Sequence, residues 1–492
     1  MNVNPITRLD YPDLDVIRVE DTYYMVSTTM HFMPGCEILQ SFDLVHWEHA
    51  TYVYETLDHT DAQQLKSGQN IYGQGMWAAS LRYHEGRFYI CFVANDTRKT
   101  YLYTSEKIDG PWKKQLIEGF YHDGSLLFDE DGRNYIVYGN DEIWITELNE
   151  DLTAPKKDGL HRLLVSDHKN PKLGYEGSHI QKINGYYYIF LIHSLRDRWM
   201  RTEACFYSDS LEGEFTGGDV LCDDRGYCGQ GVAQGGIVDT PDGKWYAMLF
   251  QDSGAVGRLP ILLPVTWKDH FPVFGQNGHV PEEIEVHSTR PGYIYQPLVG
   301  SDDFCNGLLP RWQFNHDPDP RYYHLDALQG TYTITTREVC TELTQAVNTL
   351  TQRMSYPSCA AEVTVDASAL KEGDVAGLCA FQGCYAAVGI TKHHGKYEVL
   401  MLDKKEDGIL DMTEGTVVES HQMDFRLEAD FCNMKDEARC YYRVNKGDWL
   451  PIGTVHKLYF KLDHFTGCRF GLFCYAAEET GGSACFRDFK YY

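Results

Sequence analysis

The chain has 492 residues, with 71 acidic against 44 basic side chains and a formal net charge of −27. This length predicts two domains, and the negative charge disfavours nucleic acid and anionic membrane surfaces as partners, so an uncharged ligand fits better. No stretch approaches 18 consecutive apolar residues, and residues 1–16 lack a basic segment followed by an apolar core, so we expect a cytoplasmic protein.

The 15 cysteines are scattered, odd in number and without a Cys-x-x-Cys pair. We therefore expect reduced, mostly buried thiols rather than a disulfide framework or a zinc site. Aromatic residues make up 13% of the sequence, with 34 tyrosines. This content favours a β-rich protein and would also suit a site that stacks on sugar rings.

One phrase occurs five times in the first 250 residues: a turn, then aromatic residues, then an apolar strand. The copies lie at residues 20–24, 85–89, 131–135, 184–188 and 242–246, and their closing tyrosines are 65, 46, 53 and 58 residues apart. Periods of this size, each containing a Gly- or Asp-centred hairpin, predict the blades of a β-propeller.

Counting back from these tyrosines locates candidate site residues. Trp77, Asp123, Glu176 and Gln234 lie twelve residues before four of them, and Asp13 lies eleven before Tyr24. Equal phase in a radial repeat means an equal place in each blade, so these side chains are expected to converge near the central axis. Three of them are acids, and carboxylates brought together raise at least one pKa, as general acid and base catalysis requires.

Each acid also has a structural alternative. Asp13 could cap a turn while Asp15 carries the chemistry. Asp123 could be a turn acid paired to an arginine, and Glu176 an exposed acid at a strand edge. The shared phase of Asp123 and Glu176 argues against the alternatives for these two acids, while the choice between Asp13 and Asp15 stays open.

A passage rich in proline and glycine, around residues 281–300, marks the predicted domain boundary. Residues 1–299 are predicted to form the propeller. Beyond it, short alternating strands such as residues 331–335 and 398–402 predict an antiparallel β-sandwich over residues 300–492. Few segments keep a helical apolar period, so the whole chain is predicted to be all-β.

The surroundings of the three acids, at residues 12–18, 122–126 and 175–179, resemble those of glycoside hydrolase family 43. Residues 312–316, 348–353 and 373–378 resemble the C-terminal module of the same family. The resemblance implies a five-bladed propeller and a β-sandwich that packs on it and lends a loop to close the site. A closed pocket favours exo action.

The resemblance also implies roles. Asp13 would be the general base that activates water, Glu176 the general acid, and Asp123 the residue that tunes and orients that acid. Inversion needs the base and the acid about 6.5 to 9.5 Å apart, whereas a retaining mechanism needs about 5 to 5.5 Å. Trp77 would wall the sugar site, and Arg258 would bind sugar hydroxyls unless it forms a surface salt bridge.

Two further positions follow less directly from the resemblance. Met30 would form another wall where many relatives have phenylalanine, or would simply fill the core. Gln234 stands where several branches have a histidine that organises the channel, so no metal site is predicted there. Leu14 and Ser178 also depart from the commoner pattern, in which proline is frequent.

No cofactor is expected to be required for catalysis, although backbone carbonyls and an acid such as Asp488 could hold a structural calcium in the sandwich. The sequence thus predicts an inverting exo-glycosidase that removes terminal α-L-arabinofuranosyl residues from small xylan-derived oligosaccharides. The alternatives are a β-D-xylosidase, a bifunctional enzyme, and a non-catalytic glycan-binding propeller. The sequence does not predict the oligomeric state.

Overall fold

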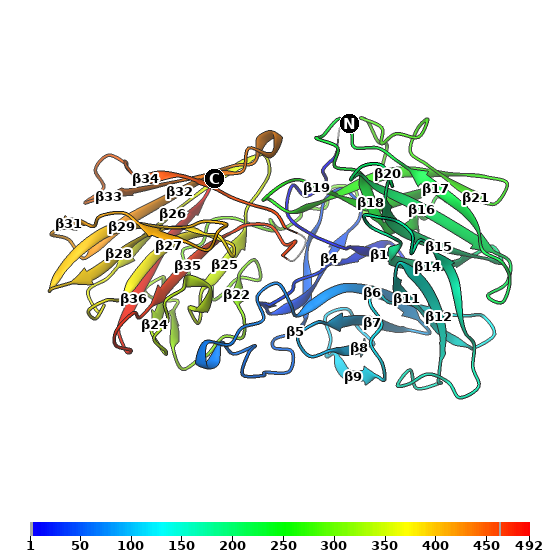
Figure 1. Cartoon of the computed structure of the whole chain (residues 1–492), viewed down its shortest axis with the longest axis horizontal. Helices are drawn as coiled ribbons and strands as arrows, with labels where there is room; N and C mark the ends of the chain where they lie inside the picture. Colours follow the sequence, from blue (N-terminus) through cyan, green and yellow to red (C-terminus); the bar gives the residue numbers. More distant parts are fainter. Residues whose placement is uncertain (1–2, 462–463) are drawn as a thin grey trace.

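The computed structural model describes residues 3–461 and 464–492, which form two β-sheet domains lying side by side (Figure 1). The described residues contain 36 strands, no α-helix, and three 3-10 helices, η1 (Lys66–Gly68), η2 (Leu343–Gln345) and η3 (Cys432–Met434). The predicted all-β class is confirmed. Within this part of the chain, no helix has the length and apolar character needed to cross a membrane.

Five four-stranded antiparallel sheets form the first domain. Their strands are, in blade 1, β1 (Asp15–Val19), β2 (Thr22–Val26), β4 (Gly35–Ser41) and β5 (Glu48–Tyr54); in blade 2, β6 (Met76–His84), β7 (Arg87–Ala94), β8 (Lys99–Ser105) and β9 (Lys113–Ile117); in blade 3, β10 (Ser125–Phe128), β11 (Asn134–Asn140), β12 (Glu142–Leu148) and β13 (His161–Ser166); in blade 4, β14 (Glu176–Ile183), β15 (Tyr186–Ser194), β16 (Arg201–Ser208) and β17 (Thr216–Leu221); in blade 5, β18 (Val232–Asp239), β19 (Trp245–Asp252), β20 (Arg258–Lys268) and β21 (Phe271–Phe274). The first strands of the blades contact one another in a closed ring, because β1 touches both β6 and β18. This arrangement is the predicted five-bladed propeller.

The repeated phrase is the hairpin between the first and second strands of each blade. In blade 4, Ile183 pairs with Tyr186 across a turn in which Asn184 and Gly185 both have positive φ, as the two-residue hairpin turns that match strand twist require. The closing tyrosine Tyr188 is buried among residues of blades 4 and 5. The repeat therefore encodes both the turn within a blade and the packing between blades.

The second domain is an antiparallel sandwich of a nine-stranded and a seven-stranded sheet. The larger sheet runs β3 (Phe32–Met33), β22 (Gln313–Asn315), β25 (Leu350–Arg353), β35 (Arg469–Tyr475), β27 (Val375–Phe381), β28 (Ala386–His393), β29 (Lys396–Lys404) and β30 (Leu410–Met412), with β31 (Thr416–Val418) also on β29; the smaller runs β23 (Tyr323–Asp326), β24 (Thr331–Thr335), β36 (Ser483–Tyr491), β26 (Ser358–Asp366), β32 (Gln422–Asp430), β33 (Glu437–Arg443) and β34 (Leu450–Lys457). Leu378 and Val388 of one sheet and Phe425 and Leu427 of the other belong to the same buried core. The predicted sandwich is confirmed.

A loop of the first blade supplies the edge strand of the sandwich. In β3, Phe32 pairs with Asn315 and Met33 with Phe314 of β22. The buried guanidinium of Arg469 lies 3.5 Å from the centre of the Phe32 ring. The predicted boundary near residue 300 falls in the connection between β21 and β22, but β3 joins the two domains across it, so their relative position is set by a shared sheet.

The 15 cysteines are all free, and nine of them are buried. Burial raises the pKa of the Cys91 thiol to about 12, which keeps it in the unreactive protonated form. The prediction of free, mostly buried thiols is confirmed, and the cytoplasmic location stays a prediction.

Candidate active site

The five positions of equal phase lie where the innermost strands begin. Asp13 and Asp123 precede β1 and β10 by two residues, while Trp77, Glu176 and Gln234 are the second, first and third residues of β6, β14 and β18. The pairing of each of these three strands with its neighbour shifts register there, as at a β-bulge. Bulges re-aim side chains, and here they occur where the side chains face the axis.

These five side chains line one small cavity of about 220 Å³. The full lining consists of Asp13, Trp77, His122, Asp123, Asn140, Leu173, Glu176, Trp199, Arg201, Gln234, Arg258 and Phe465. Met30 is not part of this lining. It is fully buried, exchanges backbone hydrogen bonds with Met76, and its sulfur accepts a hydrogen bond from Thr466.

Asp13 is held by two donors from different blades. Its Oδ2 accepts a hydrogen bond of 2.9 Å from Thr28 Oγ1, and its Oδ1 lies 2.5 Å from Nη1 of Arg258. Arg258 also contacts Asp252 through Nε at 3.2 Å. Although burial lowers the pKa of Arg258, the Asp13 and Asp252 carboxylates raise it overall, so the cation persists beside Asp13.

His122, Asp123 and Glu176 form a compact group that we call the acid cluster. Oδ2 of Asp123 accepts a hydrogen bond of 3.0 Å from the Gly177 amide and lies 3.6 Å from Nε2 of His122. Oε2 of Glu176 accepts a hydrogen bond of 2.6 Å from Asn140 Nδ2 and lies 3.7 Å from the same imidazole nitrogen. Asp13 stands apart from this cluster.

The electrostatics of the acid cluster differ from the expectation. Burial raises the pKa of Asp123 to about 6. Burial also acts to raise the pKa of Glu176, but His122, together with Arg201 and Arg258, lowers it overall. The like-charge repulsion that was expected to protonate Glu176 therefore acts on Asp123. Of these two carboxyl groups, Glu176 is the one whose pKa is held below its ordinary value.

A second group of polar side chains lies on the innermost strands, outside the lining of the cavity. We call Asp15, Arg82, Ser125 and His179 the channel cluster. Asp15 accepts hydrogen bonds from the Leu81 amide and Arg82 Nη1 and lies 3.1 Å from His179 Nδ1. Although burial opposes it, Arg82 leads the effects that lower the pKa of Asp15 to about 2. Asp15 does not line the cavity, which argues against the alternative that gave it the chemistry.

His122, Asp123 and Glu176 are also the only group of three metal-type side chains within 4.8 Å of one another among the described residues. The nearby Asp123 raises the pKa of His122 to about 9, which favours a protonated imidazole over a metal ligand. The absence of a metal from this site stays a prediction. Asp488 belongs to no such group in the described residues, and a structural calcium stays a prediction.

A family model described as glycosyl hydrolases family 43 matches residues 3–272. The chain belongs to this family. Residues 301–492 match a beta xylosidase C-terminal concanavalin A-like domain model. The chain is therefore a glycoside hydrolase, and the predicted family is confirmed.

Relatives of this family 43 chain carry two kinds of name. It is 26% identical to a beta-xylosidase from Formosa agariphila, over 98% of this chain and 88% of that protein. It is 24% identical to a non-reducing end alpha-L-arabinofuranosidase from Bacteroides ovatus, over 83% of this chain and 79% of that one. A solved bifunctional GH43-CE protein from Bacteroides eggerthii is 42% identical, with a TM-score of 0.92 over 99% of this chain. The chain spans 63% of that bifunctional protein.

The small cavity is also lined by residues that the sequence pattern did not single out. His122 was visible only as the neighbour of Asp123, and Asn140 and Leu173 lie outside the phase of the repeat. Arg201 begins β16; its Nε lies 3.0 Å from Asp252 Oδ2, but neither its Nε nor its Nη1 has a hydrogen-bond partner in the described chain. Burial lowers the pKa of Arg201.

The sandwich closes the cavity through Phe465, which lies between β34 and β35. Its ring packs edge-on against Trp77 at a centroid distance of 5.3 Å, and the Arg258 guanidinium lies 4.1 Å from its centre. The expected loop from the second domain is therefore present. A ring from each domain bounds the same small space.

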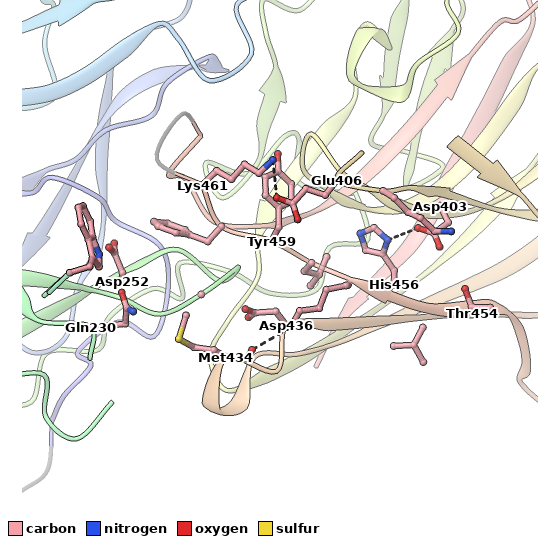
Figure 2. Close-up of a pocket in the computed structure, with 17 residues that line it drawn as sticks. Gln230, Asp252, Asp403, Glu406, Met434, Asp436, Thr454, His456, Tyr459 and Lys461 are labelled. Atoms are coloured by element: carbon pink, nitrogen blue, oxygen red, sulfur yellow. Dashed lines mark hydrogen bonds and ion pairs between the residues drawn. The ribbon is translucent and has the colours of Figure 1, made fainter. Parts of the chain in front are cut away.

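A larger cavity, of about 740 Å³, lies between the two domains. Figure 2 shows Gln230 and Asp252 on the propeller side, facing Asp403 and His456 of the sandwich. Trp199 lines this cavity and the smaller one, so the two spaces share a wall. The carboxylates of the acid cluster face only the smaller cavity.

Proposed function

We propose that this family 43 chain is an inverting exo-glycosidase that removes terminal α-L-arabinofuranosyl residues from xylan-derived oligosaccharides. The observation that carries the proposal is the small cavity of about 220 Å³ that Asp13 and Glu176 both line. This volume is below the range of about 300 to 1,000 Å³ usual for drug-sized ligands, so it suits a single sugar ring.

The geometry supports distinct roles for the two carboxylates. Asp13, paired with Arg258 and oriented by Thr28, would accept a proton from the attacking water. Glu176, oriented by Asn140, would protonate the departing glycosidic oxygen. Asp123 binds the amide of Gly177 and thereby fixes the backbone next to Glu176.

The side chains around the acids would bind the sugar. Trp77 and Phe465 offer aromatic faces, and Arg258 and Arg201 offer guanidinium donors that suit hydroxyl groups. The leaving group would extend past Trp199 into the larger cavity between the domains.

A β-D-xylosidase is the second candidate. Relatives named beta-xylosidase and alpha-L-arabinofuranosidase both align with most of this chain. Their names support a pentose as the released sugar but do not distinguish xylose from arabinose. The proposal that the substrate is a small oligosaccharide in the cytoplasm, with no cofactor required, rests on the sequence alone.

The test measures release of 4-nitrophenol from the α-L-arabinofuranoside and the β-D-xyloside by the wild type, Asp13→Asn and Glu176→Gln. Asp21→Asn, at an exposed carboxylate paired with Arg290, is the matched control. We expect activity on the arabinofuranoside that is lost in both cavity variants and kept in the control. Proton NMR of the first product would show inversion at the anomeric carbon. Wild-type inactivity on both substrates, or activity that survives both cavity substitutions, would contradict the proposal.

A further inference from the structure

His122 lies between the two carboxylates of the acid cluster. The proposed roles of Asp13, Asp123 and Glu176 do not explain this position. Its Nε2 lies 3.6 Å from Asp123 Oδ2 and 3.7 Å from Glu176 Oε2, and this buried nitrogen has no hydrogen-bond partner within the described chain. Both distances are within ion-pair range but too long for hydrogen bonds. The imidazole is therefore placed to exchange a proton with either carboxylate after a small approach.

No other cation in the described part of the chain forms an ion pair with Asp123 or Glu176. Asp13, Arg258 and Arg201 face the same cavity from other blades and act on the cluster through space. Asp13 pairs with Arg258 and Arg201 pairs with Asp252, so these opposite charges partly offset. His122 is thus the one cation in direct ion-pair range of both carboxylates among the described residues.

In the acid cluster, the transferable proton is held by His122 and not by the expected general acid. A general acid must carry a proton before the bond breaks, yet His122 lowers the pKa of Glu176. The Asp123 carboxylate raises the pKa of His122 to about 9 against the effect of burial. At neutral pH the transferable proton is therefore on the imidazole.

We propose that His122 stores the proton of the general acid and passes it from Nε2 to Oε2 of Glu176 when a glycoside fills the cavity. This inference rests on the proposed glycosidase function. The N–H bond on His122 breaks as an O–H bond forms on Glu176, which leaves a neutral imidazole. Glu176 then protonates the glycosidic oxygen as the C–O bond breaks, while the attacking water gives its proton to Asp13. Solvent afterwards returns one proton to His122 and removes one from Asp13, so the reaction balances.

The positions of the neighbours support this transfer. Asn140 donates to the same Glu176 oxygen, Oε2, that faces His122. Neutralising Glu176 would weaken that hydrogen bond, so a bound substrate must favour the transfer by excluding water around the carboxylate. The edge-to-face packing of Trp77 on His122, at 6.2 Å between ring centroids, couples the imidazole to the wall of the sugar site.

The test is the pH dependence of kcat/KM for the wild type and His122→Phe, a planar ring that keeps the packing against Trp77. Without the imidazolium, only the carboxyl pair can hold the proton, so the alkaline limb is expected to move down by at least about one pH unit. At about pH 8 the variant should lose about tenfold or more, and near pH 5 it should keep most of its activity. His122→Asn is the second variant, and it should move the limb in the same direction.

His193→Gln is the matched control, because His193 is a buried histidine beside Asp219 that does not line the cavity. It should leave the profile unmoved. An NMR titration of the His122 ring proton, assigned from the His122→Phe spectrum, gives a readout that does not depend on activity, and its midpoint is expected near pH 9. An unmoved alkaline limb, or a midpoint at or below the ordinary histidine value, overturns the inference. An inactive wild type overturns the proposed function, and the titration then still decides whether His122 holds the proton.

Discussion

Two polar groups lie along the same propeller axis, and Asp13 and Asp15 belong to different ones although they are two residues apart. In the channel cluster, Asp15 is bound by the Leu81 amide, Arg82 and His179, and its pKa falls to about 2. In the cavity above, Asp123 has its pKa raised to about 6 by burial. Two residues there, His122 and Arg201, keep buried nitrogens without hydrogen-bond partners.

The difference between the two groups shows that one fold can hold some buried charges for stability and others for chemistry. A buried charge whose partners are all protein atoms stabilises the native state, and one left partly unpaired is available to a ligand. The same ring of strands supplies both environments, because Asp13 precedes β1 while Asp15 lies within it, and residues two apart share a face at successive positions along the strand. Substitutions in the two groups should therefore have opposite consequences.

The largest expected effect is loss of activity in Asp13→Asn. Removing one general base typically lowers the rate by about 10²- to 10⁴-fold. Arg258 keeps Asp252 as a partner, so the melting temperature should change little. Steady-state kinetics with a thermal melt checks this. A large fall in melting temperature would instead give Asp13 a structural role like that of Asp15.

The next effect is a loss of stability in Asp15→Asn. This variant leaves Arg82 without its carboxylate in a buried site, and breaking such a pair costs about 3 to 5 kcal/mol. Urea and thermal denaturation should show the loss, while kcat of the folded protein should stay within about tenfold of the wild type. If Asp15→Asn were inactive but as stable as the wild type, Asp15 would have a catalytic role and not a structural one.

The third expected effect is on the pH dependence of the free energy of unfolding. Asp123 in the acid cluster and Asp15 in the channel cluster should change it in opposite directions. The pKa of Asp123 in the folded state, about 6, lies above its value in the unfolded chain. Its stabilising contribution to the free energy of unfolding is therefore present below about pH 4 and is lost as the pH rises through 6. Asp123→Asn should therefore be more stable than the wild type at about pH 8, by up to about 3 kcal/mol, and similar at about pH 4.

The contribution of Asp15 has the opposite sign. Its folded pKa of about 2 lies below the unfolded value, so its contribution is present above about pH 4 and is lost as pH falls towards 2. Melting temperatures of the wild type, Asp123→Asn and Asp15→Asn across this pH range check both signs. Parallel profiles for the two variants would contradict the comparison.

The smallest expected effect concerns Arg201. Arg201 lines the cavity, and its Nη1 has no hydrogen-bond partner in the described chain. A hydrogen bond to a charged group contributes about 1.5 to 3 kcal/mol. Arg201→Met should therefore raise KM by about tenfold or more. Because Asp252 keeps Arg258 as a partner, this variant should lower the melting temperature less than loss of Arg82 does. Arg82→Met is the control, and it should lower the melting temperature. If Arg201→Met destabilises the fold as much as Arg82→Met does, Arg201 is structural.

The sequence by itself determined the repeats and the register of the site. A five-fold phrase with a hairpin turn predicts five blades, and equal phase predicts that Asp13, Trp77, Asp123, Glu176 and Gln234 meet, because radial repetition converts equal sequence phase into equal position. The sandwich followed in the same way from alternating strands. These features depend on local periodicity, which a single sequence displays.

Only the tertiary structure decided which side chains complete the site. Phe465 reaches the cavity from another domain, and Arg201 and Asn140 come from strands outside the phase of the repeat. The pairing of β3 with β22 likewise joins residues almost 300 apart. The place of the proton depends on distances of 3.6 and 3.7 Å around one imidazole nitrogen. Burial and charge act through space, so no spacing along the chain could reveal where that proton lies.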